Sequence, residues 1–183
     1  MKKAITICLL AVSLLAGGMA MDAKTPGGKA TAKTSKTHSQ SGAFTLTCLL
    51  HKENRSGFMF NSDSKIEAAL KKAGFSLKSK NVTRGEIADG TEGDTSPGKI
   101  IDFVYTKKGI TVEWTSYVYD EAPNNPYKDR IVINFSDSAA KDSFIKSVKS
   151  NGYKLDYGTY VDPNRTIDIK VEGNKVILEG NWG

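Results

Sequence analysis

The chain has 183 residues, of which 39% are hydrophobic and 25% are charged, and it contains 17 glycines. This composition is typical of a globular protein and excludes a wholly disordered chain, a collagen and a coiled coil. The two cysteines, Cys8 and Cys48, are too few for a disulfide framework. These totals limit the class of the protein and leave its activity open.

The first twenty residues have the pattern of a secretory signal peptide. Lys2 and Lys3 form a basic start, residues 4–15 form an apolar run, and Gly18 and Ala20 are small residues suited to a cleavage site. The run is shorter than the roughly 20 residues that a membrane span needs. We therefore expect cleavage after Ala20, a periplasmic or secreted location, and no membrane span in the mature chain.

The positive charge of the chain lies mostly in its first part. The whole sequence has 26 Lys and Arg against 20 Asp and Glu, a net charge of +6. Residues 21–42 are rich in Lys, Thr and Ser, which favours a disordered spacer. Residues 43–183 keep 20 basic against 19 acidic side chains. Because nucleic-acid binding needs a basic face on the folded domain, we expect no nucleic-acid partner.

Two segments of similar pattern predict amphipathic helices that end at Gly74 and Gly152. A glycine there supplies the left-handed turn that lets the chain continue as a strand. Polar residues before each helix predict N-terminal caps. The candidates are Ser62, Asp63 or Ser64 for the first helix, with Ser64 and Glu67 fitting a capping box, and Ser136 or Asp137 for the second.

Alternating apolar and polar residues predict strands around both helices. Hairpins with turns at Gly109 and Gly173 follow the helices, and the short apolar segments 58–60 and 131–135 precede them. The first half has a long link over residues 80–99, and the second has a shorter link over residues 156–165. Residues 44–50 fit either a strand or a helical turn.

These elements predict an α+β fold. It consists of tandem β-α-β-β-β units, over residues 43–122 and 123–183, with two helices packed on one face of an antiparallel sheet of about eight strands. The other face of the sheet is expected to be polar.

Residues with reactive side chains are few in the predicted mature chain. Cys48 and His51 are close enough to meet on a helical turn, but leucines surround Cys48, which favours a small buried hydrophobic residue. The acidic, glycine-rich residues 86–94 lack the spacing of a known calcium loop. No nucleophile elbow, phosphate-binding loop or zinc-protease motif occurs in the sequence. We expect no catalytic residues, metal or cofactor, and a protein that is not an enzyme.

Four tyrosines are the candidate binding residues. Tyr117 and Tyr119 fall on the polar side of the strand that carries Trp114, and Tyr157 and Tyr160 flank the link of the second unit. Exposed aromatic residues are frequent anchors of interfaces. Trp114 and Trp182 are in phase with the buried positions and are expected in the core.

In layout alone, residues 58–182 resemble the β-lactamase inhibitory proteins and PepSY-like periplasmic proteins. This resemblance implies binding of partner proteins over a sheet face and assigns no site residue. We expect an exported, non-enzymatic binding protein of a bacterial cell envelope, which contacts a protein or glycan through an open sheet face and adjacent loops. The alternatives are a small secreted hydrolase that uses carboxylates and a structural envelope component. The sequence leaves the oligomeric state open.

Overall fold

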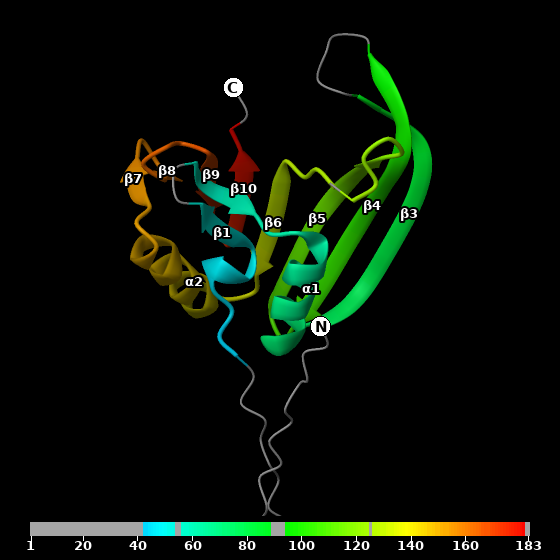
Figure 1. Cartoon of the computed structure of the whole chain (residues 1–183). Helices are drawn as coiled ribbons and strands as arrows, with labels where there is room; N and C mark the ends of the chain where they lie inside the picture. The colour runs from blue at the N-terminus through cyan, green and yellow to red at the C-terminus, as the bar shows by residue number, and fades with distance from the viewer. Residues whose placement is uncertain (1–41, 54–55, 89–93, 125, 182–183) are drawn as a thin grey trace, which may run out of the picture. The chain divides into compact units, whose positions relative to one another are not determined.

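The computed structural model describes residues 42–53, 56–88, 94–124 and 126–181 (Figure 1). The predicted signal peptide, the predicted spacer up to residue 41, and Trp182 lie outside these residues. The described residues all belong to one compact unit. Neither of its helices combines the length and the apolar character that a membrane span requires.

Eight strands of the described chain form one antiparallel sheet, which confirms the predicted α+β class. Strand β5 from the first predicted unit pairs with β6 from the second, so both units contribute to the same sheet. The strands, in their spatial order, are β3 (Ser76–Ala88), β4 (Thr95–Lys107), β5 (Ile110–Tyr119), β6 (Arg130–Phe135), β10 (Lys175–Gly180), β9 (Ile167–Glu172), β8 (Thr159–Val161) and β7 (Lys154–Asp156).

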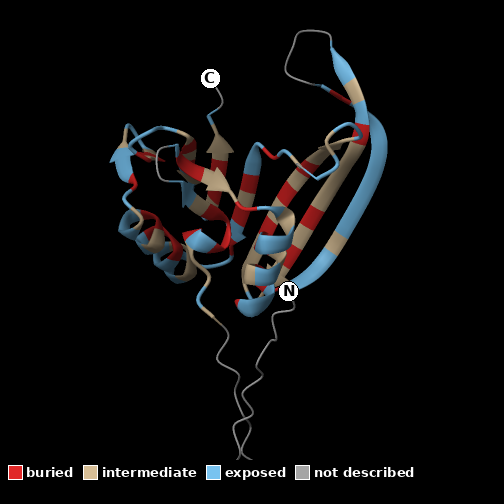
Figure 2. Ribbon diagram, in the orientation of Figure 1, coloured by how far each residue is buried: buried red, intermediate tan, exposed pale blue. Residues whose placement is uncertain are grey.

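One face of this sheet carries the rest of the fold (Figure 1). Helices α1 (Asp63–Lys72) and α2 (Ser138–Ser150) lie on it, together with a ribbon of β1 (Leu50–Glu53) and β2 (Gly57–Phe60). Residues 44–50 form the short 3-10 helix η1 (Leu46–Cys48) and the start of β1. Burial alternates along β5 and β6, as Figure 2 shows, because only one side of each strand faces the helices. Strand β10 departs from this pattern, since Val176, Ile177 and Leu178 are all buried, so the opposite face of the sheet is less uniformly polar than predicted.

The core is one cluster between the helices and the sheet. Apolar burial of this kind is the main favourable term in folding. Trp114 lies in the cluster, as predicted, and its indole stacks on the Phe103 ring with centroids 4.6 Å apart. The largest fully buried side chains are Tyr105, Phe103, Phe144, Leu46, Leu49, Leu50, Ile66, Leu70, Ile131, Ile133, Ile167 and Ile169.

The helix ends confirm part of the predicted capping. Gly74 and Gly152 have φ angles of 88° and 93°, which is the left-handed conformation that glycine favours. The Asp137 side chain accepts a hydrogen bond from Ala140 N at 2.8 Å. The predicted capping box of Ser64 and Glu67 is wrong. Ser62 takes the cap position without a side-chain bond, and the Glu67 carboxylate instead accepts the hydroxyl of Tyr105 at 2.7 Å.

The predicted links are wrong in both halves. Residues 80–88 and 95–99 belong to the paired strands β3 and β4, each 13 residues long. Strand β3 is an edge strand, and both of its sides are largely exposed to solvent. Its sequence therefore lacks the alternation of apolar and polar residues that predicts a strand. The link over residues 156–165 contains the additional strand β8. The second half therefore has one strand more than predicted.

The first strands of the two halves also differ in their pairing. Strand β2 pairs with β1 outside the main sheet, whereas β6 lies near the centre of the sheet between β5 and β10. The exposed Tyr157 and Gly158 have φ angles of 44° and 87° and form the tight turn between β7 and β8. Two consecutive left-handed residues are the signature of a type I′ hairpin turn.

Tyr153 supplies a prediction about stability. Its hydroxyl is buried and lacks a hydrogen-bond partner within the described residues. We expect Tyr153→Phe to raise the free energy of unfolding by about 0.5–1 kcal/mol, because the variant no longer buries an unpaired polar group. Urea unfolding at pH 7 measures this change, and a lower stability would contradict it.

The same tyrosine sets an expected pH dependence. Burial, followed by the nearby Asp162 and Asp168 carboxylates, holds the pKa of Tyr153 well above its ordinary value of 10.0. The folded protein keeps this proton above pH 10 while the unfolded chain loses it, so stability falls as the pH rises through 10. We expect Tyr153→Phe to lose less stability between pH 9 and 11 than the unmodified chain.

Candidate binding face

The side of the sheet opposite the helices is referred to here as the outer face. Along β5, Val112, Trp114 and Ser116 are buried toward the helices. The alternation of a strand therefore directs Tyr117 and Tyr119 to the outer face. Both rings are half-buried.

A local shift in pairing brings two further residues to this face. Strands β5 and β6 pair in regular register as far as Trp114 and Ile131, but Tyr117 then pairs with Tyr127 instead of Lys128. The extra residue is typical of a β-bulge. Lys128 points inward, with 4% of its side chain exposed, and its neighbours Tyr127 and Asp129 line the outer face.

Buried polar partners hold Lys128 in its inward position. Its Nζ donates to Asn61 O at 3.1 Å and lies 3.2 Å from the Asp63 carboxylate. The same carboxylate accepts hydrogen bonds from Trp114 Nε1 at 3.1 Å and from Ser116 Oγ at 2.7 Å. The N-terminus of α1 thus fixes the bulge from behind the sheet.

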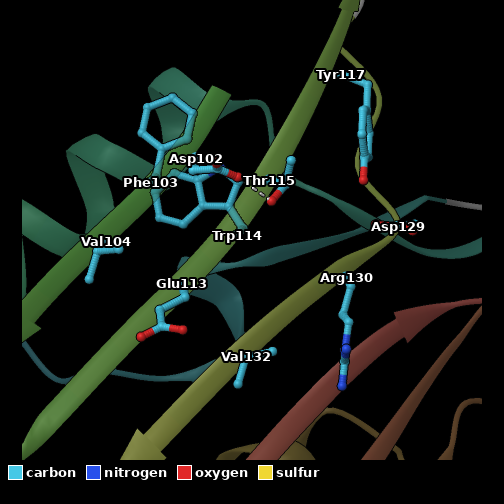
Figure 3. Close-up of a pocket in the computed structure, with 10 residues that line it drawn as sticks. All are labelled: Asp102, Phe103, Val104, Glu113, Trp114, Thr115, Tyr117, Asp129, Arg130 and Val132. Atoms are coloured by element: carbon cyan, nitrogen blue, oxygen red, sulfur yellow. Dashed lines mark hydrogen bonds between the residues drawn. The ribbon is translucent and has the colours of Figure 1, made fainter. Parts of the chain in front are cut away.

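The first hollow on the outer face has a volume of about 500 Å³ and lies across β4, β5 and β6 (Figure 3). Figure 3 shows Tyr117 and Asp129 at one end, and Glu113 and Val132 toward the other. The remaining residues that line it are Asp102, Phe103, Val104, Trp114, Thr115 and Arg130.

A second hollow adjoins the first and shares Tyr117 and Asp129 with it. Its volume is about 290 Å³, and its lining is more apolar because Ile87 and Ile100 contribute to it. Gly98 is needed beneath it, since a Cβ atom there would lie 2.5 Å from the backbone oxygen of Val118 and 2.5 Å from Ile87 Cδ1. The two hollows form one continuous surface along β5.

The tyrosines differ in how they contribute to this surface. The rings of Tyr117 and Tyr127 lie with centroids 6.2 Å apart and planes tilted by 34°. The Tyr119 hydroxyl donates to Ala88 O at 2.9 Å and so ties β5 to the end of β3. Tyr119 therefore lines the second hollow and also holds two of its walls together.

The other two candidate tyrosines lie elsewhere in the fold. Tyr157 is fully exposed at the β7–β8 turn. Tyr160 is only 9% exposed and belongs to the core, where the Lys149 ammonium lies 5.8 Å from the centre of its ring. Tyr160 is buried because it lies on strand β8, within residues 156–165 that were predicted to be a link. Tyr157 and Tyr160 therefore do not join Tyr117 and Tyr119 in one site.

Carboxylates lie close to the two paired tyrosines of the outer face, Tyr117 and Tyr127. Burial raises the pKa of the Tyr117 hydroxyl above its usual value, and the Asp129 and Asp102 carboxylates raise it further. Burial and Asp129 also raise the pKa of Tyr127. The cation that lines the first hollow, Arg130, has its Nε 3.4 Å from the Glu179 carboxylate.

The Cys48 thiol and the His51 imidazole contact different groups. Cys48 is buried, and its Sγ contacts Thr45 Oγ1 at 3.9 Å and Ala43 O at 3.8 Å. The His51 imidazole lies with Nε2 3.5 Å from the Glu53 carboxylate. In the described part of the chain, no group of three His, Cys, Asp or Glu side chains is placed to hold a metal ion. Residues 89–93 of the acidic glycine-rich segment lie outside that part.

Comparisons with protein-family models, with curated proteins and with solved structures found no match for this chain.

Proposed function

We propose that this protein is an exported, non-enzymatic binding protein of a bacterial cell envelope, and that the outer face around Tyr117 is its contact surface. The observation that carries the proposal is the pair of adjoining hollows at Tyr117, on a sheet face that neither helix covers. Tyrosines that are partly exposed beside apolar side chains supply large contact areas at a low entropic cost. The signal-like residues 1–20 support export.

The position of the surface on rigid strands supports the same function. Tyr117 lies on β5 and forms a backbone bridge with Tyr127, with N–O distances of 2.8 Å in both directions. A contact surface that is ordered before binding loses less conformational entropy on association.

The two alternatives have less support. A carboxylate hydrolase needs an acid and a base that flank an enclosed substrate, whereas the carboxylates here line open hollows on a sheet face. A structural component needs a surface for self-association, and among the described residues the exposed edge strand β3 is the candidate for it. Its largely polar side chains give it less apolar contact area than the hollows at Tyr117.

Photo-cross-linking tests the proposed surface. We expect a chain of residues 21–183 with Tyr127→benzoylphenylalanine to form one discrete cross-linked product in a bacterial envelope extract, because the proposed partner covers that ring. Asp142→benzoylphenylalanine is the matched control, since Asp142 is an exposed residue of α2. Equal products from both positions, or a product from position 142 alone, would place the contact surface elsewhere.

We also propose that the two halves descend from one repeated unit. Gly74 and Gly152 support this idea, since both end a helix in the left-handed conformation and precede the buried aromatic residues Phe75 and Tyr153. The different pairing of β2 and β6 would then be a later divergence. Sequences of relatives test it: a profile of the first half that matches the second above chance supports the repeat, and a profile without such a match contradicts it.

A further inference from the structure

We infer that the occupant of the outer face is a basic, extended segment of a partner protein, with a Lys or Arg side chain in the first hollow and an apolar side chain in the second. The inference rests on the proposed function and specifies its ligand. Three observations carry it: the unbalanced charge of the first hollow, the apolar lining of the second, and the length of the surface along β5.

The first hollow contains more negative than positive charge. Its three carboxylates belong to Asp102, Glu113 and Asp129. Asp102 accepts a hydrogen bond from Thr115 Oγ1 at 2.7 Å, while Glu113 and Asp129 have no cationic partner among the described residues. The cationic side chain of this hollow, Arg130, lies near Glu179, whose carboxylate also pairs with Lys170, so the full charge of Arg130 is counted. Three carboxylates against this one guanidinium still leave the first hollow with an excess of negative charge. A cationic side chain is the complement that this hollow lacks.

Tyr117 adds a second attraction for a cation. Its ring lies at the end of the first hollow beside Asp129 (Figure 3). An ammonium or guanidinium group over the face of a tyrosine is attracted by the ring quadrupole. Arg or Lys is therefore favoured over a neutral sugar, which has no positive charge to place there.

The second hollow is suited to an apolar side chain. Ile87 and Ile100 line it beside the rings of Tyr119 and Tyr127. A single segment that fills both hollows must run along β5 from Glu113 to Tyr119. These residues span roughly 20 Å at about 3.3 Å per residue, and an extended peptide of about six residues covers this length.

The test measures binding of a fluorescein-labelled octapeptide, Gly-Lys-Leu-Arg-Leu-Lys-Leu-Gly, to residues 21–183 by fluorescence anisotropy. Two matched probes have glutamate or glutamine in place of the three basic residues, and a fourth probe is a labelled N-acetylglucosamine tetramer. We expect the basic peptide to bind at least about tenfold more tightly than the glutamate peptide at low salt, and to lose about tenfold between 0.05 and 0.5 M NaCl.

Variants assign the binding to the outer face. We expect Glu113→Gln and Asp129→Asn each to weaken binding of the basic peptide about threefold, and the double variant about tenfold, because each removes one charge from a partly exposed site. Asp142→Asn on α2 is the control and is expected to leave binding unchanged. Thermal unfolding by circular dichroism checks that all variants remain folded.

Three results would overturn the inference. The first is equal or tighter binding of the glutamate or glutamine peptide, the second is no binding of the basic peptide at 1 mM, and the third is binding that the Glu113 and Asp129 variants leave unchanged. Binding of the oligosaccharide that Tyr117→Ser abolishes would overturn the basic ligand while keeping the proposed surface. A cross-link at position 142 alone would overturn the surface itself, so the two failures are distinguishable.

Discussion

Replacing Asp63 by alanine is expected to lower the free energy of unfolding by about 3 kcal/mol, because the change leaves the buried Lys128 ammonium without its carboxylate. The indole of Trp114 and the hydroxyl of Ser116 also lose their acceptor. Urea unfolding followed by circular dichroism measures the loss.

A double-mutant cycle separates this network from simple loss of helix stability. We expect the double variant Asp63→Ala with Lys128→Met to be more stable than the sum of the single changes, since no unpaired charge stays buried. Arg84→Met is the surface control, because Arg84 forms an ion pair with Asp120 at 3.2 Å in which both side chains are exposed. We expect it to cost no more than about 0.5 kcal/mol. Additive effects of Asp63 and Lys128 would contradict the proposed coupling.

Asp162→Ala is expected to lower the free energy of unfolding by about 3 kcal/mol, because it removes a buried acceptor that orders a loop. The carboxylate accepts hydrogen bonds from Thr166 N at 2.8 Å and from Asn164 N at 3.1 Å. Thr166 Oγ1 in turn accepts from Phe58 N at 2.9 Å, which joins this loop to the β1–β2 ribbon. Chemical unfolding measures the loss.

Asp162→Asn tests whether the acceptor oxygen of this side chain is what stabilises the loop. It keeps one side-chain oxygen as an acceptor, so we expect it to lose clearly less stability than Asp162→Ala. Asp142→Asn, at an exposed position, is expected to have no measurable effect. If Asp162→Ala and Asp142→Asn were equally stable, the hydrogen bonds of Asp162 would contribute nothing to the fold.

Sequence patterns over a few neighbouring residues predicted the elements that form through contacts between such residues. Both helices, and the turns at Gly109 and Gly173, follow from periodicity and from the need for a left-handed residue, and the structure has them. The hairpin of β3 and β4 could not be predicted in the same way. Its edge strand β3 is exposed to solvent along nearly all of its length, so polar residues occupy both sides of the strand.

The candidate site was predictable only in part for a related reason. Alternation along β5 placed Tyr117 and Tyr119 on the polar side of the strand. The outward positions of Tyr127 and Asp129 depend on a one-residue shift in the pairing register of the two strands. The hydrogen bond of Lys128 to Asn61 and its ion pair with Asp63 stabilise this shift. Those partners lie more than sixty positions earlier in the sequence, beyond the reach of any local pattern.

The measurement that tests the account most directly is a nitrogen-15 NMR titration of residues 21–183 with the basic octapeptide. We expect the chemical-shift changes to concentrate at amides of β4, β5 and β6 around Tyr117, and the amides of α2 and of the Tyr157 turn to stay unchanged. Shifts confined to α2 or to the β7–β8 hairpin, or none at saturating peptide, would contradict it.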